Sequence, residues 1–315
     1  MRRLLVTGHV LGGFLVLFSL AFALPLGWSL EVGDGAHRGF VYAGVLSASC
    51  GVLLWTLTRG VGREMQARDG ALLVVACWLS AALASTIPFL TELPGLSFTD
   101  AFFEAMSGLT TTGSTVLSGL DTLPQSLNIW RHALQWFGGM GIIVLAVAVL
   151  PLLGVGGMQL YKAETPGPIK EGKLTPRIAQ TAKYLWLLYA ALTALCMLSL
   201  RAAGLSWFES VCHAFSTLAL GGFSTRDASI AGFESPLVEG IMITFMMLAV
   251  LNFATHFSAL RQRSLRAYWR DAEAVWVIIL IGSSCLLIAI TLSLAIVRGW
   301  SSVVLAVVLL LTVFV

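Results

Sequence analysis

The residues best suited to chemistry in this chain are the polar and glycine residues of Ser107–Thr115, which lie between two long apolar segments. In hydrocarbon a non-helical backbone has no water to bond with. Such a run is tolerated at membrane depth only where protein shields it or where it lines a water-filled path. The run therefore predicts the lining of a pore, and a flexible external turn rich in Thr and Gly is the alternative.

The oxygen atoms of this run suit a cation. Thr110 to Gly113 offer carbonyl and hydroxyl oxygens without any acidic side chain. Rings of such oxygens replace the hydration shell of K+ in selectivity filters. Gly113 is the residue able to take a positive φ and so turn carbonyl groups toward an axis.

The segment that must position this run is Phe98–Leu109, which is apolar but only about a dozen residues long. A bilayer needs roughly 20 residues to be spanned, so we predict a pore helix that enters the membrane and turns back. Its C-terminal end would direct a negative dipole at the run, which favours a cation.

A second copy of this arrangement lies further along the chain. The stretch Ser216–Phe223 aligns with Ser107–Ser114 without a gap, and a long apolar segment flanks each copy on both sides. The positions that match are Asp100 with Glu209, Ala105 with Ala214, Ser107 with Ser216, Leu109 with Leu218 and Gly113 with Gly222. Long-period self-similarity of this kind indicates a repeated unit of span, re-entrant pore loop and span.

The composition is that of a polytopic membrane protein. Apolar residues make up 57% of the chain, charged residues 11%, and the mean hydropathy is +0.88, far from the balance of a soluble domain. The net charge of +3 does not suggest nucleic acid. The five cysteines are scattered in apolar stretches and form no Cys-x-x-Cys pair, so no disulfide or metal cluster is expected.

We predict all-α architecture with two preface spans followed by repeated helix, re-entrant pore loop and helix units of the K+-channel type. The first apolar run is longer than the core of a cleaved signal and is interpreted as an uncleaved span. The predicted spans are 4–26, 40–57, 70–89, 130–153, 179–200, 237–260 and 275–297. The corresponding domains are 1–69 (preface helices), 70–160 (first pore repeat), 161–274 (cytoplasmic loop and second pore repeat) and 275–315 (start of an incomplete third repeat).

The basic residues predict the orientation. With a cytoplasmic N-terminus, 14 of the 19 Lys and Arg residues fall inside, and the five outside are Arg38, Arg131, Arg201, Arg226 and Arg298. This bias agrees with the positive-inside rule and puts the entrances of both pore loops on the outer face. The acidic residues lean outward, which predicts either a cation-concentrating vestibule or ordinary solvated loops.

Three further interpretations concern single residues. Arg131, beside Trp130 at the start of a span, is interpreted as an interfacial anchor. Asp100 and Glu104 are expected to stabilise the N-terminal end of the first pore helix. His213 and His256 are interpreted as hydrogen-bonded packing residues and not as proton relays.

Four motifs together resemble the TrkH family, the potassium-transporting subunits of bacterial Trk systems in the Trk/Ktr/HKT superfamily. They are Leu109–Gly113, Gln135–Gly141, Leu150–Tyr161 and Gly221–Thr225, and the similarity runs to about Val297. The resemblance implies a K+-conducting protein of the bacterial inner membrane with four pseudo-repeats around one pore. It also implies a homodimer, surrounded by membrane lipid, on a cytosolic nucleotide-binding ring of the TrkA type, with no organic cofactor on this chain.

Carried over by position, the resemblance assigns two filter segments to this chain. They are Thr110, Thr111, Thr112 and Gly113 in the first loop, and Ala219, Leu220, Gly221 and Gly222 in the second. Four segments are needed to surround an ion, and 301–315, at the place of a third pore helix, is almost wholly aliphatic and lacks glycine. The expected function is K+ uptake, with coupling to H+ or Na+ left open; the alternative is a truncated, non-conducting fragment or scaffold that needs the missing repeats. An enzyme is not expected, because no nucleophile with a base and no metal set appears at membrane depth.

Overall fold

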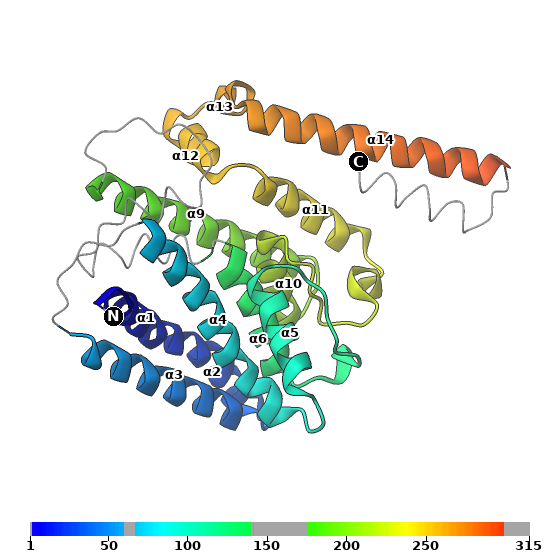
Figure 1. The fold of residues 1–315 in the computed structure, drawn as a ribbon. Coiled ribbons are helices and arrows are strands. Elements are labelled where there is room, and N and C mark those ends of the chain that lie inside the picture. Colours follow the sequence, from blue (N-terminus) through cyan, green and yellow to red (C-terminus); the bar gives the residue numbers. More distant parts are fainter. Residues whose placement is uncertain (1, 60–66, 140, 142–174, 299–315) are drawn as a thin grey trace. The chain divides into compact units, whose positions relative to one another are not determined.

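The computed structural model describes residues 2–59, 67–139, 141 and 175–298, and all regular elements within them are helical (Figure 1). Short 3-10 turns cover Leu20–Phe22, Leu120–Thr122 and Ser229–Phe233. The α-helices are α1 (Arg2–Ser19), α2 (Ala23–Val32), α3 (His37–Leu57), α4 (Ala67–Glu92), α5 (Phe98–Leu109), α6 (Gln125–Gly139), α9 (Thr175–Ala202), α10 (Trp207–Ala219), α11 (Pro236–Val250), α12 (Phe253–Gln262), α13 (Arg266–Arg270) and α14 (Ala272–Arg298).

Five described segments are long and apolar enough to cross a membrane: Leu5–Val32, His37–Leu57, Leu72–Glu92, Lys183–Ala202 and Ala272–Thr291. Their number rises to six if α11 and α12 count as one broken span. The helices α5 and α10, of 12 and 13 residues, are too short for this. The protein is therefore an all-α, multi-pass membrane protein in which two short helices stand between spans.

Two predicted boundaries differ from the structure. The first span was predicted to end near Leu26, but helix continues through Pro25 to Val32, because the fixed φ of proline is compatible with the first turn of α2. The span predicted over 237–260 is interrupted between α11 and α12 at Leu251 and Asn252. The second half of the span predicted over 130–153, the motif 150–161 and the segment 301–315 lie outside the described residues.

The described chain falls into two compact units, the first ending at Ala249 and the second beginning at Val250. In the second unit His256 Nδ1 lies 2.8 Å from the Tyr268 hydroxyl, and the Asn252 amide donates to Glu273 over 3.3 Å. The hydrogen-bonded role predicted for His256 is therefore confirmed. All pore-loop elements belong to the first unit.

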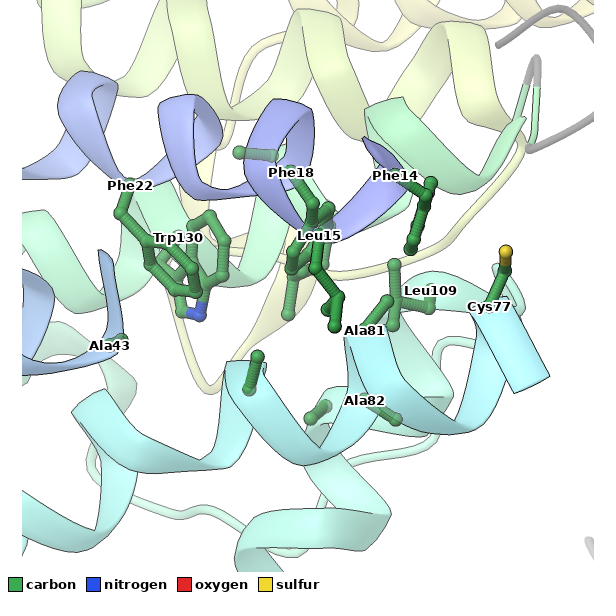
Figure 2. Packing of buried hydrophobic residues seen from close by; sticks show 14 of the residues in the cluster. Phe14, Leu15, Phe18, Phe22, Ala43, Cys77, Ala81, Ala82, Leu109 and Trp130 are labelled. Carbon is green, nitrogen blue, oxygen red and sulfur yellow. The ribbon is translucent and has the colours of Figure 1, made fainter. Parts of the chain in front are cut away.

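The core of the first unit is built where α1, α3 and α4 pack against the pore-loop helices (Figure 2). Trp130 of α6 is fully buried, with Phe22 4.5 Å and Phe40 6.2 Å away between ring centroids. The preface helices thus hold the N-terminal half of α6 in place. Trp130 is therefore a core residue.

A second contact between the preface and α6 is polar. The Asp34 carboxylate, in the loop between α2 and α3, accepts from the backbone amide of Ser126 over 2.9 Å, from the amide of Ala36 over 3.2 Å and from the Ser29 hydroxyl. Burial raises the pKa of Asp34, but these hydrogen bonds lower it more, and its pKa falls below the ordinary value. Asp34 therefore caps the N-terminus of α6 as an ionised group.

Candidate functional site

The two short helices begin in the same way. Ser97 caps α5 by accepting from the Asp100 amide over 3.1 Å, and Ser206 caps α10 by accepting from the Glu209 amide over 3.1 Å. The carboxylates of Asp100 and Glu209 bond back to their serine hydroxyls over 2.8 and 2.9 Å. The role predicted for Asp100 at the N-terminal end of the helix is confirmed, and the two caps occupy equivalent positions of the two repeats.

The two helices also end in the same way. Beyond α5 the Thr112 amide donates to the Ser107 carbonyl over 3.0 Å, and beyond α10 the Gly221 amide donates to the Ser216 carbonyl over 2.9 Å. The sequence correspondence between the two repeats is therefore reproduced in the backbone hydrogen bonds.

The backbone conformation of both loops repeats as well. Thr111 and Leu220 have φ of 55° and 53°, and Gly113 and Gly222 have φ of 74° and 81°. The positive φ predicted for Gly113 is present. Thr111 and Leu220 take the left-handed region without being glycine, which costs about 1–2 kcal/mol each, so the surrounding structure must hold them there.

The carbonyl oxygens of these loops are largely free of donors. No described residue donates a hydrogen bond to the carbonyl oxygens of 110–113, or to those of Ala219, Leu220 and Gly222. The Gly221 carbonyl is different, because it accepts from Gln135 Nε2 over 2.6 Å. Thr110, Thr112, Leu220 and Gly222 are exposed, Thr111 and Gly113 partly buried, and Ala219 and Gly221 buried.

The two loops touch each other through their backbones. A Cβ built on Gly113 would overlap the Gly221 carbonyl oxygen and would lie 3.1 Å from its carbon and 3.5 Å from the Gly222 Cα. The absence of a side chain at Gly113 is therefore required for the approach itself. The structure thus brings the two sequence-predicted segments together.

Two adjacent glycines of α6 pack against the C-terminal ends of α5 and α10, from which the two loops begin. A Cβ on Gly138 would overlap the carbonyl oxygen of Leu109, the last residue of α5, and a Cβ on Gly139 would lie 2.8 Å from the Cα of Ala219, the last residue of α10. These two residues therefore allow α6 to pack closely against the ends of both α5 and α10.

A buried ion pair joins α5 to α6 next to the first loop. Glu104 of α5 and Arg131 of α6 are both fully buried, and Glu104 Oε1 lies 2.7 Å from Arg131 Nε. The carboxylate of Glu104 also accepts from the Thr115 hydroxyl over 3.0 Å and from the Val116 amide over 3.2 Å. The interpretations of Arg131 as an interfacial anchor and of Glu104 as a helix-end charge are therefore wrong. Their mutual attraction and shared hydrogen bonds offset the desolvation of two charges.

The guanidinium of Arg131 reaches the second repeat as well. Its Nη1 donates to the Ser224 carbonyl over 3.3 Å and to Asn128 Oδ1 over 3.0 Å, and its Nη2 donates to the Thr115 hydroxyl over 3.1 Å. Its Cζ stands 4.3 Å from the ring centroid of Phe223. Arg131 thus contacts the segments that leave both loops.

Histidine and acidic residues near the loops have structural partners. His213 is buried with Nε2 3.2 Å from the Thr225 hydroxyl, which confirms its hydrogen-bonded packing role. Asp227 accepts from the amides of Gly119 and Leu120 over 3.0 and 3.1 Å, and so joins the segments that follow the two loops. Among the described residues no group of three or more His, Cys, Asp or Glu side chains could hold a metal ion.

Sequence reasoning missed the polar face of α6. Asn128, Arg131 and Gln135 follow one another at spacings of three and four, and Gly138 follows Gln135 by three, which places all four on one side of a helix. This stripe was visible in the sequence. The target of Arg131 and Gln135, the backbone of the second loop 86 to 93 residues away, was not visible.

Comparisons with known proteins all point to the same family. A TrkH family model described as "Cation transport protein" matches residues 36–313. The "Trk system potassium uptake protein TrkH" of Salmonella typhimurium is 50% identical over 266 residues, which are 84% of this chain and 55% of that protein. The protein of the same name from Halomonas elongata is 45% identical over 285 residues, 90% of this chain and 59% of that one.

A solved structure agrees with this result. The crystal structure of the potassium transporter TrkH from Vibrio parahaemolyticus has a TM-score of 0.79 at 39% identity, and covers 96% of this chain and 60% of that one. This chain spans a little more than half the length of the curated relatives that it matches. With its paired short helices and its multi-pass architecture, the chain belongs to the TrkH family of cation transport proteins, which are transporters and not enzymes.

Proposed function

We propose that this chain supplies two of the pore loops of a potassium uptake protein in the bacterial inner membrane, as the membrane subunit of a Trk-type system. The observation that carries the proposal is the repeated loop in which Thr111, Gly113, Leu220 and Gly222 all have positive φ and most carbonyl oxygens lack a donor among the described residues. Carbonyl groups without internal partners can replace the water shell of K+. The C-terminal ends of α5 and α10 add a negative potential at the same place.

The filter segments are 110–113 and 219–222, with K+ as the transported ion and no organic cofactor. In the second segment we assign the main role to the carbonyls of Ala219, Leu220 and Gly222, because the Gly221 carbonyl already accepts from Gln135. The Thr110 and Thr112 hydroxyls lie 2.7 Å apart and that of Thr110 donates to the Met106 carbonyl over 2.8 Å. The hydroxyl groups therefore stabilise the loop, and backbone oxygens face the ion.

The assembly follows from the resemblance to Trk systems. We propose a homodimer of the complete protein on a cytosolic, nucleotide-binding ring of the TrkA type, with the N-terminus in the cytoplasm. A pore loop that faced lipid would leave several backbone groups unpaired, at a few kcal/mol each. Two further loops must therefore close the pore.

The test measures the K+/Na+ flux ratio in proteoliposomes that contain the full-length protein, by which we mean a Trk-type subunit with this chain and the two further loops proposed above. Gly113→Ala and Gly222→Ala each force alanine into the left-handed region, and we expect each to lower the ratio about tenfold, since the conformation costs about 1–2 kcal/mol. Gly113→Ala also collides with Gly221, whereas nothing lies within 4 Å of a Cβ on Gly222. We therefore expect Gly113→Ala to reduce total K+ flux as well.

Gly119→Ala is the matched control. Gly119 has φ of 72°, close to that of Gly113, but a Cβ there meets only the Thr122 hydroxyl at 3.5 Å, outside the proposed filter. It carries the same backbone cost and should leave the flux ratio unchanged. Equal K+/Na+ flux ratios in all three variants and the wild type would show that Gly113 and Gly222 do not belong to the filter.

The second candidate is a non-conducting fragment or scaffold, favoured by the coverage of little more than half of the relatives' length. Expression of the 315-residue chain and of the full-length protein in cells that lack K+ uptake separates the two. Growth at low K+ with the full-length protein alone indicates that the remaining loops are needed. No growth with either would contradict the proposed transport function.

A further inference from the structure

We propose that Arg131 is a positioning residue for ion selectivity, which fixes the two filter segments relative to each other through contacts with the residues next to them. This inference rests on the proposed function. The observation is that one guanidinium makes contacts in both repeats. It binds Glu104 and Thr115 of the first repeat and the Ser224 carbonyl of the second.

The placement of these partners is close to both filters. Thr115 follows Gly113 by two residues, and Ser224 follows Gly222 by two residues. Phe223, on which the guanidinium stacks, lies between Gly222 and Ser224. A shift of Arg131 therefore moves the C-terminal side of each filter segment, where the glycines set the direction of the carbonyl groups.

The same helix adds a second brace one turn further on. Gln135 Nε2 donates to the Gly221 carbonyl over 2.6 Å, and Gln135 Oε1 accepts from the Phe223 amide over 3.4 Å. Arg131 and Gln135 thus bind the second loop on both sides of Gly222. Gly222 itself is exposed, and no atom lies within 4 Å of a Cβ placed on it, so its conformation depends on these flanking contacts.

The chemistry requires arginine. A planar guanidinium with five donors can satisfy a carboxylate, a hydroxyl, an amide oxygen and a backbone carbonyl at once, whereas a lysine ammonium is a single point charge with three donors. Lysine at this position would still neutralise Glu104. It could not span Glu104, Thr115 and Ser224 together.

The chain offers a matched ion pair for comparison. Arg226 Nη2 lies 2.6 Å from Glu209 Oε1, and the guanidinium Cζ stands 4.2 Å from the ring of Phe233. Every one of these partners belongs to the second repeat, and the side chains are 34% and 18% exposed. This pair has the chemistry of Glu104 and Arg131 without the bridge between repeats.

The experiment measures K+/Na+ flux ratio and thermal stability of the full-length protein in proteoliposomes and detergent. We expect Arg131→Lys to remain folded and to lower the flux ratio about tenfold, the scale set by loss of a charged hydrogen bond. The double variant Glu104→Gln/Arg131→Met removes both buried charges together and is expected to fold, with the same loss of selectivity. Arg226→Lys and Glu209→Gln/Arg226→Met should keep the wild-type ratio.

The outcomes are distinct. Folded Arg131→Lys and Glu104→Gln/Arg131→Met proteins with the wild-type ratio would overturn the role of Arg131 and leave the proposed filter intact. Failure of both to fold, with the Arg226 variants folded, would assign Arg131 a structural role only and would equally overturn the inference. A wild-type protein without preference for K+ would contradict the proposed function itself.

Discussion

Substitution of Gly138 by alanine probes whether α6 holds the pore helices in place. A Cβ at this position would overlap the Leu109 carbonyl oxygen and would lie 2.7 Å from its carbon and 3.3 Å from its Cα. All three are backbone atoms at the end of α5, so no side-chain rotation can relieve the overlap. The end of α5 or the helix α6 must move by about 1 Å, which close-packed interiors resist.

The magnitude follows from two opposing effects. Overpacking of a well-packed interior costs about 1–3 kcal/mol, and a backbone obstacle favours the upper part of that range. The higher helix propensity of alanine returns up to about 1 kcal/mol. The net loss of about 2 kcal/mol corresponds to a fall in Tm of about 4–8 °C for a unit of roughly 250 residues.

The assay is thermal unfolding of the full-length protein in mild detergent, together with K+ flux. Gly27→Ala is the control, because Gly27 is an exposed residue within α2 and no atom lies within 4 Å of its Cβ position. We expect an unchanged or slightly higher Tm there, since only helix propensity changes. An unchanged Tm and an unchanged flux in Gly138→Ala would refute the close contact between α6 and the end of α5.

Two further predictions concern the loops outside the spans. Because the folded-state pKa of Asp34 is lowered, its ionised form stabilises the protein above the unfolded-state pKa of about 3.9, and this contribution is lost as pH falls through the lower, folded-state value. Asp34→Asn should therefore reduce Tm at pH 7, and the difference from wild type should shrink below pH 4; a constant difference would contradict the role of the charge. The predicted membrane orientation can be tested by labelling. A cysteine at Asp121 should react with an impermeant thiol reagent in intact cells and one at Gln262 should not. Labelling at Gln262 alone would show that the orientation is the reverse.

The pore helices were predictable because their signals are local. Ser97 and Ser206 each precede an acidic residue by three positions, which is a capping pattern, and the helix length follows from the apolar runs. The positive φ of Gly113 follows from the same kind of reasoning, because glycine in a polar run marks a turn. The internal repeat then added the second loop.

The support of the loops was not predictable in the same way. Arg131 follows Trp130, and that pair at the start of a span is typical of an interfacial anchor. In the structure both residues are fully buried, because the preface helices cover Trp130 and Glu104 pairs with Arg131. Contacts across 27 and 93 residues depend on tertiary packing, which periodicity within one helix does not encode.

The break between α11 and α12 was not predictable from hydropathy either. The apolar composition of 237–260 satisfies a span, so hydropathy alone continues the helix through Leu251 and Asn252. Asn252 is a poor residue for a helix interior, because its side chain competes with the backbone for hydrogen bonds. Its carbonyl accepts from the Thr255 amide over 2.9 Å, which starts the next helix instead of continuing the previous one.

The two repeats share a backbone and differ in the side chains that hold it. The residues at equivalent positions behind the loops are Glu104 and His213, and those in the left-handed region are Thr111 and Leu220. Glu104 is ionically paired to α6, whereas the Nε2 of His213 lies against Thr225 of its own repeat. Similar φ values are therefore stabilised by an ion pair to α6 within the first repeat in one loop, and by local contacts together with Gln135 in the other. Because the second loop receives its cross-repeat support from α6, a perturbation of α6 should disturb both segments.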